Sequence, residues 1–292
     1  MIAAGLPAGG RTSDGIADVA VRALRGEAWL TPKPGLVDCR GGGSHDDMDL
    51  PLLLASAESL RSTFRRIAEV AGRSAVGVSL REELGRLGRA GDRAMLRVTG
   101  GVNTHRGALW AVGLLVAAVA GGAGDEREAA RAAARLAVLP DLRIPVGDSH
   151  GRQVWLRYGV AGARGEAEAA FPHVIEVALP RLRRARADGL GEAVARVDAL
   201  LEVMSLLADT CVLHRGGHEG LRAVRRGAGR VLAEGGSGTG SGLAALAELD
   251  ELLRRRRLSP GGSADLLAAA LFLDMVPWGS PRAGPEVFAC RR

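Results

Sequence analysis

Apolar residues recur at intervals of three and four over most of this chain, which is the spacing of one face of an α-helix. The first such stretch begins at Ser13, a candidate N-cap, and is ended by Pro32 and Pro34. Further stretches cover residues 53–67, 80–94, 108–120, 125–138, 173–189 and 191–213. Because neither strand alternation nor an internal repeat interrupts them, the pattern predicts an all-α fold of roughly ten helices.

The segments between these helices set the predicted domain organisation. Residues 1–12 are expected to form a loose N-terminal tail and 281–292 a C-terminal tail, on either side of one all-α domain at 13–280. The Gly/Ser-rich segment 234–242 has the composition of a flexible loop. Because helices of the same kind lie on both sides of it, we expect a loop inside a single globular multi-helix domain and not a domain boundary.

The amino-acid composition limits the kinds of molecule that we expect the protein to bind. Hydrophobic residues make up 47% of the chain but aromatic residues only 3%, too few for platforms that stack single-stranded nucleic acid. The net charge of +6 suits an anionic partner such as a polyphosphate nucleotide, a nucleic acid or an acidic carrier protein. The arginine run at 254–257 ends a helical stretch, where cations complement the helix dipole. We therefore expect no nucleic-acid partner.

The expected compartment is a reducing cytoplasm. The three cysteines, Cys39, Cys211 and Cys290, have neither the spacing of a disulfide framework nor that of a metal site. The first residues lack the long apolar core of a signal peptide. The longest apolar run, 108–120, is too short to span a bilayer, so we expect a buried helix there and no membrane partner.

Two residues that are the only ones of their type in the chain point to candidate chemistry. Lys33 is the only lysine among 39 basic residues, and Asn103 is the only asparagine. Their rarity fits a coding bias that replaces dispensable lysine with arginine, so the remaining lysine is expected where a guanidinium will not serve. Chance is the alternative explanation. Both residues lie in Gly-rich or Pro-rich segments dense in polar side chains, which favours function.

Five polar segments at helix ends or in Gly-rich loops are candidate parts of a site. The first runs from Glu27 through Lys33 to Asp49 and offers several carboxylates, the ligands that Mg²⁺ prefers. Asp46 or Asp47 alternatively charges the first turn of the next helix. The second, 103–107, enters a very apolar helix and would line the floor of a pocket.

The other three segments follow the same logic. The third, 162–167, holds Arg164 between glycines, which favours a close approach to phosphate, although an Arg–Glu pair there is also an ordinary structural feature. The fourth contains Asp209, a carboxylate near the end of an apolar helix, which is costly unless paired or bound to metal. The fifth, 259–265, has the features of an anion-binding helix start with Ser263 as N-cap, or of a plain loop and cap.

Taken together and in this order, six segments resemble those of the triphosphoribosyl-dephospho-CoA synthase family. They are residues 32–38, 43–48, 103–107, 162–167, 209–217 and 259–265. The stretch 148–160 looks more like the malonate decarboxylase branch of this family than the citrate lyase branch. Two departures are Cys211, where the family commonly has Asn, and Ala170, where it commonly has Gly.

The resemblance implies a pentosyltransferase. Its substrates would be ATP and 3′-dephospho-CoA, and its products adenine and 2′-(5″-triphosphoribosyl)-3′-dephospho-CoA, the precursor of the prosthetic group of a decarboxylase acyl carrier protein. Such chemistry needs a carboxylate near an oxocarbenium-like centre, a general base for the 2′-hydroxyl, and cations on the triphosphate.

On that basis each candidate residue has an expected role. The expected ligands of a Mg²⁺ cofactor are Asp38, Asp47 and Asp209. Either Glu166 or His45 would be the general base, and Asn103 and His105 would orient ribose or adenine. The expected substrate-binding residues are Lys33, Arg106, Arg164, Arg215, Ser259, Gly261, Gly262 and Ser263.

Two rival functions fit the same residues. One is a nucleosidase that hydrolyses the glycosidic bond of ATP, which would release adenine without an acceptor. The other is a non-enzymatic module that binds CoA-like ligands or a carrier protein, which would release none.

Overall fold

The chain folds from helices, as a computed structural model describes it for residues 11–143 and 150–278. The predicted C-terminal tail and most of the N-terminal one lie outside these residues. Thirteen α-helices and one π-helical segment are present in the described part: α1 (Ser13–Ala28), α2 (Leu50–Ser59), α3 (Arg61–Ala71), α4 (Val78–Val98), α5 (Arg106–Ala120), α6 (Glu126–Ala137), α7 (His150–Tyr158), α8 (Gly162–Glu168), η1 (His173–Ala178), α9 (Leu179–Ala187), α10 (Glu192–Leu206), α11 (Thr210–Ala233), α12 (Gly240–Arg255) and α13 (Gly261–Met275). No strand occurs in these ranges, which confirms the all-α prediction.

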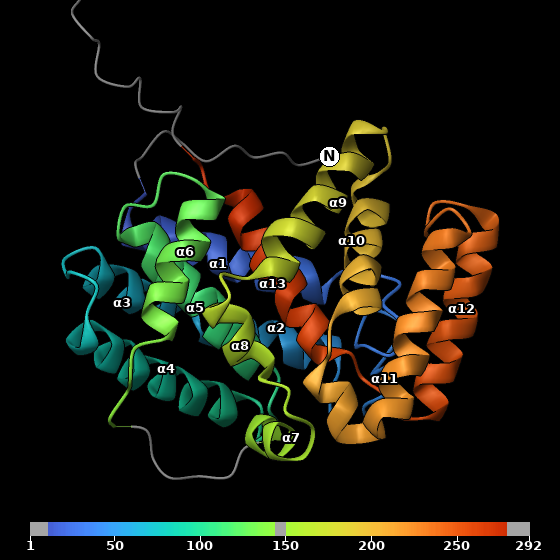
Figure 1. Cartoon of the computed structure of the whole chain (residues 1–292), viewed down its shortest axis with the longest axis horizontal. Coiled ribbons are helices and arrows are strands. Elements are labelled where there is room, and N and C mark those ends of the chain that lie inside the picture. Colours follow the sequence, from blue (N-terminus) through green and yellow to red (C-terminus); the bar gives the residue numbers. More distant parts are fainter. Residues whose placement is uncertain (1–10, 144–149, 279–292) are drawn as a thin grey trace, which may run out of the picture.

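Two apolar helices, α5 and α13, form the centre of the molecule. Both are buried on nearly all sides, as expected of helices without a polar face. Around them pack α1, α3, α6, α10 and η1, while α11 and α12 lie side by side at one edge (Figure 1). No helix in the described part of the chain is both long and apolar enough to cross a membrane.

The predicted helix at 191–213 is wrong in one respect, because the chain leaves helical geometry after Leu206. Asp209 has an extended backbone and caps a new helix, α11, by accepting hydrogen bonds from the N–H groups of Cys211 and Val212. The carbonyls freed by the break are bonded as well, since the guanidinium of Arg225 donates to Leu206 and Leu207. The break places the Asp209 carboxylate at a helix start, where the helix dipole favours negative charge.

Two smaller expectations also differ from the structure. The N-cap of α1 is Thr12, whose hydroxyl accepts from Gly15 N–H, and not Ser13. The Gly/Ser segment 234–242 is a bonded turn in which α12 already begins at Gly240. Within it, Ser237 N–H donates to the buried Asp198 at 2.7 Å.

Candidate functional site

Asp209 joins the start of α11 to the start of α13. Its Oδ1 accepts the N–H of Cys211 at 2.9 Å, and its Oδ2 accepts the N–H and the hydroxyl of Ser263 at 2.8 and 2.9 Å. Burial raises the pKa of Asp209, although the hydrogen bonds from Ser263 and Cys211 act in the opposite direction. The group at the start of α13 that accepts these hydrogen bonds is therefore a carboxyl group of the protein itself. The N-cap position is Pro260, which makes no side-chain hydrogen bond, and not Ser263.

The two glycines of this segment leave room for that contact. A Cβ on Gly262 would lie 3.1 Å from Asp209 Oδ1, and one on Gly261 would lie 3.2 Å from the sulfur of Cys211. The Gly262 N–H also points to Asp209 Oδ1 at 3.3 Å. The predicted substrate-binding residues Gly261, Gly262 and Ser263 thus form a close joint between two helices.

Asp265 brings the start of α5 to the same place. A Cβ on Gly107 would overlap the Oδ2 atom of Asp265, and the Asp265 carboxylate accepts the backbone N–H of Ala108. Burial, together with the carboxylates of Glu27 and Asp209, raises the pKa of Asp265 well above its usual value. Sequence reasoning gave Asp265 no role, although it lies in the fifth candidate segment. The close fit with Gly107, far away in sequence, has no local signal.

Lys33 is fully buried and bonded to the last turn of α1. Its Nζ donates to the Glu27 carboxylate at 2.5 Å and to the Glu27 carbonyl at 2.8 Å, with only 1% of the residue exposed. Its backbone N–H donates to Asp38 at 2.9 Å. Burial alone would raise the pKa of Asp38, but the hydrogen bonds from Arg40 and Lys33 hold it below its usual value.

The loop that carries Lys33 is fixed to the C-terminal end of α12. Gly35, at φ +68°, donates its N–H to Asp250 at 2.8 Å, and a side chain there would meet Leu258. The hydroxyl of Ser44 donates to the carbonyls of Leu253 and Leu258. These contacts explain the glycines of the first candidate segment, since the backbones approach closely there.

His45 connects this loop to α11 and to the segment before α13. Its Nε2 lies 2.9 Å from the hydroxyl of Ser259, and its Nδ1 lies 3.2 Å from a guanidinium nitrogen of Arg215. Because arginine only donates, Nδ1 is the acceptor and Nε2–H donates to Ser259. Burial first, and then Arg215, lower the pKa of His45, while the exposed Asp47 at 3.5 Å opposes this.

His105, just before α5, is buried beside these groups. Its Nδ1 lies 2.8 Å from the hydroxyl of Ser56 on α2, which in turn lies 2.5 Å from the hydroxyl of Thr104. Burial, with a smaller contribution from the ammonium of Lys33, lowers the pKa of His105 to about 4. The imidazole is therefore neutral at physiological pH.

The start of α8 lies beside the start of α11, and its charged residues have partners of their own. A Cβ on Gly162 would lie 2.8 Å from Thr210. Arg164 is exposed and pairs with Glu168 at 2.7 Å. The two carboxylate oxygens of Glu166 accept from the backbone N–H of His173, at 2.8 Å, and lie 2.9 Å from its Nδ1. The structure therefore places Glu166 in a contact that holds the start of η1.

Asn103 and Arg106 lie on the outside of the molecule. The Asn103 carbonyl oxygen accepts the N–H of Arg106 at 3.3 Å, a contact that caps the first turn of α5. The Arg106 guanidinium pairs with Asp92 on α4 at 2.9 Å through two hydrogen bonds. Both residues are exposed, and their predicted contacts with substrate stay predictions.

The three aspartates predicted to share Mg²⁺ lie in three different surroundings. Asp38 is bonded to Arg40 and Lys33, Asp209 to two helix starts, and only Asp47 has an exposed carboxylate. In the described part of the chain, no three His, Cys, Asp or Glu side chains form a group that could hold a metal ion. A joint site for all three is therefore absent from this arrangement.

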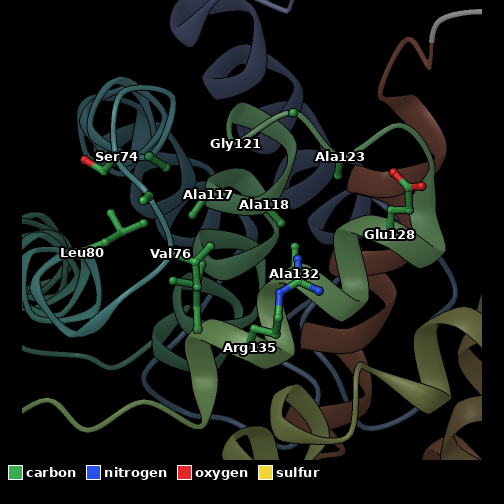
Figure 2. A pocket seen from close by; sticks show the side chains of 14 residues that line it. Ser74, Val76, Leu80, Ala117, Ala118, Gly121, Ala123, Glu128, Ala132 and Arg135 are labelled. Atoms are coloured by element: carbon green, nitrogen blue, oxygen red, sulfur yellow. The ribbon is translucent and has the colours of Figure 1, made fainter. Parts of the chain in front are cut away.

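The central groups form what we call the polar cluster, where the starts of α5, α11 and α13 meet the Lys33 loop. Its members are Glu27, Lys33, His45, His105, Asp209, Arg215, Ser259, Ser263 and Asp265. A separate cavity of about 360 Å³ lies between the ends of α3 and α5 and the helices α4 and α6 (Figure 2). None of its lining residues belongs to the polar cluster, so we do not assign it to the same site.

The comparisons with known proteins agree with one another. The chain matches the family model described as CitG: ATP:dephospho-CoA triphosphoribosyl transferase over residues 13–282. A probable 2-(5″-triphosphoribosyl)-3′-dephosphocoenzyme-A synthase from Pseudomonas fluorescens is 55% identical, with 90% of this chain and 92% of the relative covered. The synthase of that name from Klebsiella pneumoniae is 52% identical, with 89% and 94% covered. No solved structure matches the chain.

The family model spans all six segments that carry the resemblance, and the relatives are matched over most of their own length. The resemblance noted from the residues is therefore confirmed. The chain belongs to the ATP:dephospho-CoA triphosphoribosyl transferase family.

Proposed function

We propose that this chain transfers the 5-triphosphoribosyl group of ATP to the 2′-hydroxyl of 3′-dephospho-CoA, with release of adenine. The observation that carries the proposal is identity above one half, over about nine tenths of both chains, with relatives that bear the name of this synthase. A further relative from Pseudomonas aeruginosa, 54% identical with 90% of each chain covered, bears the same name as a probable assignment.

The polar cluster has the electrostatics that this reaction needs. Helix starts carry partial positive charge, and three of them, α5, α11 and α13, meet at the cluster, where Asp209 and Asp265 already accept some of their N–H groups. Arg164 on α8 and Arg215 on α11 are exposed. To bind a polyphosphate, Arg164 would leave Glu168, and Arg215 would leave His45 and two backbone carbonyls. In our proposal they hold the triphosphate, so that the attack occurs at ribose C1′ and not at phosphorus.

We assign the general base to His45. A base must be neutral before it accepts a proton, and burial and Arg215 both favour the neutral imidazole. Its Nδ1 carries the lone pair, which becomes available when Arg215 leaves it for the phosphates, while Nε2–H is oriented by Ser259. Glu166, the other predicted base, has both carboxylate oxygens on His173, so we give it a positioning role.

Mg²⁺ belongs to the proposal as the counter-ion of the triphosphate. It commonly binds one or two carboxylates together with substrate phosphates. Asp47 fits this chemistry because its carboxylate is exposed, and the neighbouring Asp46, paired with Arg257 at 3.0 Å, is exposed too. The fit does not extend to Asp38 and Asp209, whose oxygens already accept several hydrogen bonds each.

The finer biological role rests on the sequence alone. We propose that the product serves the acyl carrier protein of a malonate decarboxylase, because residues 148–160 resemble that branch. Residues 148 and 149 of this stretch lie outside the described residues. A cytoplasmic location accords with the cysteine content and with these substrates.

The test is incubation of the protein with ATP and Mg²⁺, with and without 3′-dephospho-CoA, followed by chromatography and mass spectrometry. Transfer predicts adenine release that depends on the acceptor, and an acceptor product heavier by one triphosphoribosyl unit. Equal adenine release without acceptor would identify a nucleosidase. No adenine under either condition would leave the binding module as the better reading.

A further inference from the structure

Arg81, on α4, is the one buried arginine in the described part of the chain. Only 5% of its side chain is exposed, and its ion pair with Asp141 is 3.5 Å long, beyond the usual range of a hydrogen bond. Its Nε is fully enclosed and has no acceptor. A buried charged donor that lacks an acceptor costs free energy, and service to a bound ligand is one of the few reasons for a protein to keep one.

Asp141, the carboxylate paired with Arg81, is shared with a second arginine of α4. Its Oδ2 accepts from Arg89 at 2.7 Å, and it lies directly against the backbone of the helix, where a Cβ on Gly85 would overlap it. Burial lowers the pKa of Arg81, and the charge of Asp141 opposes this. The nearby charges of Arg164 and Arg89 lower that pKa further. Three guanidiniums thus lie around a carboxylate that can neutralise one of them.

An aromatic ring joins Arg81 to α8. The guanidinium of Arg81 lies 5.1 Å from the centre of the Trp110 ring on α5, a position in which the ring attracts the cation. The indole N–H of Trp110 donates to the carbonyl of Ala163 at 3.1 Å, which fixes the ring against the first turn of α8. Arg164 is the next residue of that turn. Two of the three arginines are therefore held by different helices on either side of one fixed ring.

The group is open to solvent and adjoins the polar cluster. The side chain of Arg164 is 68% exposed and that of Arg89 27%. Gly162, just before Ala163, lies against Thr210, the residue that follows Asp209 in the polar cluster. A ligand that reaches Arg164 from the polar cluster therefore comes to the surface on which Arg89 is accessible.

We propose that Arg81, Arg89 and Arg164 form a phosphate-binding subsite, with the buried Arg81 as its floor. The inference rests on the proposed function, both of whose substrates carry phosphate groups. A guanidinium offers paired N–H donors that match the oxygens of a phosphate. Arg164 would exchange Glu168 for the phosphate at little cost, because their ion pair is exposed. We assign the subsite to the triphosphate of ATP, which Arg164 holds in the proposed function.

Binding of inorganic tripolyphosphate, measured by calorimetry in about 0.15 M salt, tests the subsite without turnover. We expect a Kd below about 1 mM for the wild-type protein. Arg81→Gln should raise it by about 10- to 100-fold, the usual effect of losing a charged hydrogen-bond partner. Arg86→Gln is the matched control, because Arg86 is on the same helix but is exposed and bonded to Glu83. A wild-type protein that does not bind tripolyphosphate, or an unchanged Kd in Arg81→Gln, would overturn the proposal.

Steady-state kinetics identify the substrate whose phosphates occupy the subsite. In Arg81→Gln we expect the KM for ATP to rise by about tenfold or more, with kcat and the KM for dephospho-CoA little changed. A rise in the KM for dephospho-CoA alone would keep the phosphate subsite and assign it to the acceptor. A merely structural role would instead lower kcat and leave the binding of tripolyphosphate unchanged, which contradicts the proposal.

Arg89→Gln covers the case in which Arg81→Gln does not fold. Each variant leaves Asp141 paired with the other arginine, and Arg89→Gln should also raise the Kd for tripolyphosphate by about tenfold. A wild-type Kd in that variant would then count against the subsite. If the wild-type protein binds tripolyphosphate through these arginines but forms no triphosphoribosyl product, the proposed function fails and the subsite stands. If product forms and the variants bind and react as wild type, only the subsite fails.

Discussion

Lys33 and Asn103 are each the sole example of their residue type in the chain, yet the structure places them in opposite surroundings. Lys33 is buried to 99% and bonded twice to Glu27, inside the polar cluster. Asn103 is exposed, and its side chain accepts one hydrogen bond, from the backbone of Arg106. The same compositional argument therefore singled out a central residue and a peripheral one.

The difference shows what the rarity of a residue type indicates about its position. A residue type that is kept at only one position marks a place where its chemistry is needed, but the need differs between Lys33 and Asn103. At Lys33 it is a compact cation that fits a closed space beside a carboxylate. At Asn103 it is a short side chain that bonds the backbone near a helix start, for which asparagine is among the best residues. In the second segment the central residues are His105 and Gly107 instead.

The largest effect that would sharpen this comparison is expected from Lys33→Arg. The guanidinium is larger than the ammonium and has no room in the space that Lys33 fills, so the loop from Lys33 to Ser44 should shift. A displacement of about 1 Å near the reacting groups costs on the order of 100-fold in rate, which is the loss we expect in acceptor-dependent adenine release.

Arg40→Lys is the control for Lys33→Arg. Arg40 lies in the same loop and pairs with Asp38 and with Asp250 on α12, but its side chain is half exposed. We expect it to lower the rate much less. A Lys33→Met variant leaves Glu27 unpaired and buried, and should lose about 3–5 kcal/mol of unfolding free energy in urea titrations. An unimpaired Lys33→Arg enzyme would break the comparison, because the buried rare residue would then matter no more to the transfer rate than the exposed one.

The sequence predicted the helices far better than it predicted which polar groups meet. Helical spacing is local, so the stretches around α1, α5 and α6 were found within a few residues. The break at Asp209 was missed because the apolar pattern continues across it. It becomes visible only when the partner, Ser263 on another helix, is known. Pairing across 54 residues leaves no mark in local spacing.

The fifth candidate segment shows the same limit at the site itself. The serines and glycines at the start of α13 predicted N–H groups that would bind an anion. They did not indicate that Asp209 accepts these N–H groups, or that Asp265 lies against Gly107. The sequence could therefore indicate which segments hold polar residues, whereas the contacts of these residues depend on segments far apart in the chain.

The second effect concerns the pH dependence of stability and compares His105 with Asn103 in one segment. Burial lowers the pKa of His105 from 6.5 to about 4. Between these two pH values the unfolded chain binds a proton at this residue and the folded protein does not. Folding stability is then complete above pH 6.5 and falls as pH drops towards 4, by roughly 3 kcal/mol for this group. In His105→Gln, urea unfolding between pH 7 and pH 4.5 should show that much less loss.

The exposed His218 provides the control for this pH series, and His218→Gln should leave the wild-type slope in place. An unchanged slope in His105→Gln would mean that His105 is not buried in solution. That outcome would mean that the whole segment around Asn103 lies on the outside of the molecule.

The smallest effect is expected from Asn103→Ala, and it tests the comparison most directly. The variant removes one exposed capping contact of 3.3 Å, which predicts a loss of about 1 kcal/mol in unfolding free energy. The transfer rate should stay within about threefold of wild type, because a frayed first turn of α5 moves His105 only slightly. Asn103→Asp keeps an acceptor oxygen and should restore the stability. If Asn103→Ala instead lowers the transfer rate while stability stays unchanged, Asn103 contacts substrate, as its rarity first indicated. Both rare residues would then be needed for the reaction.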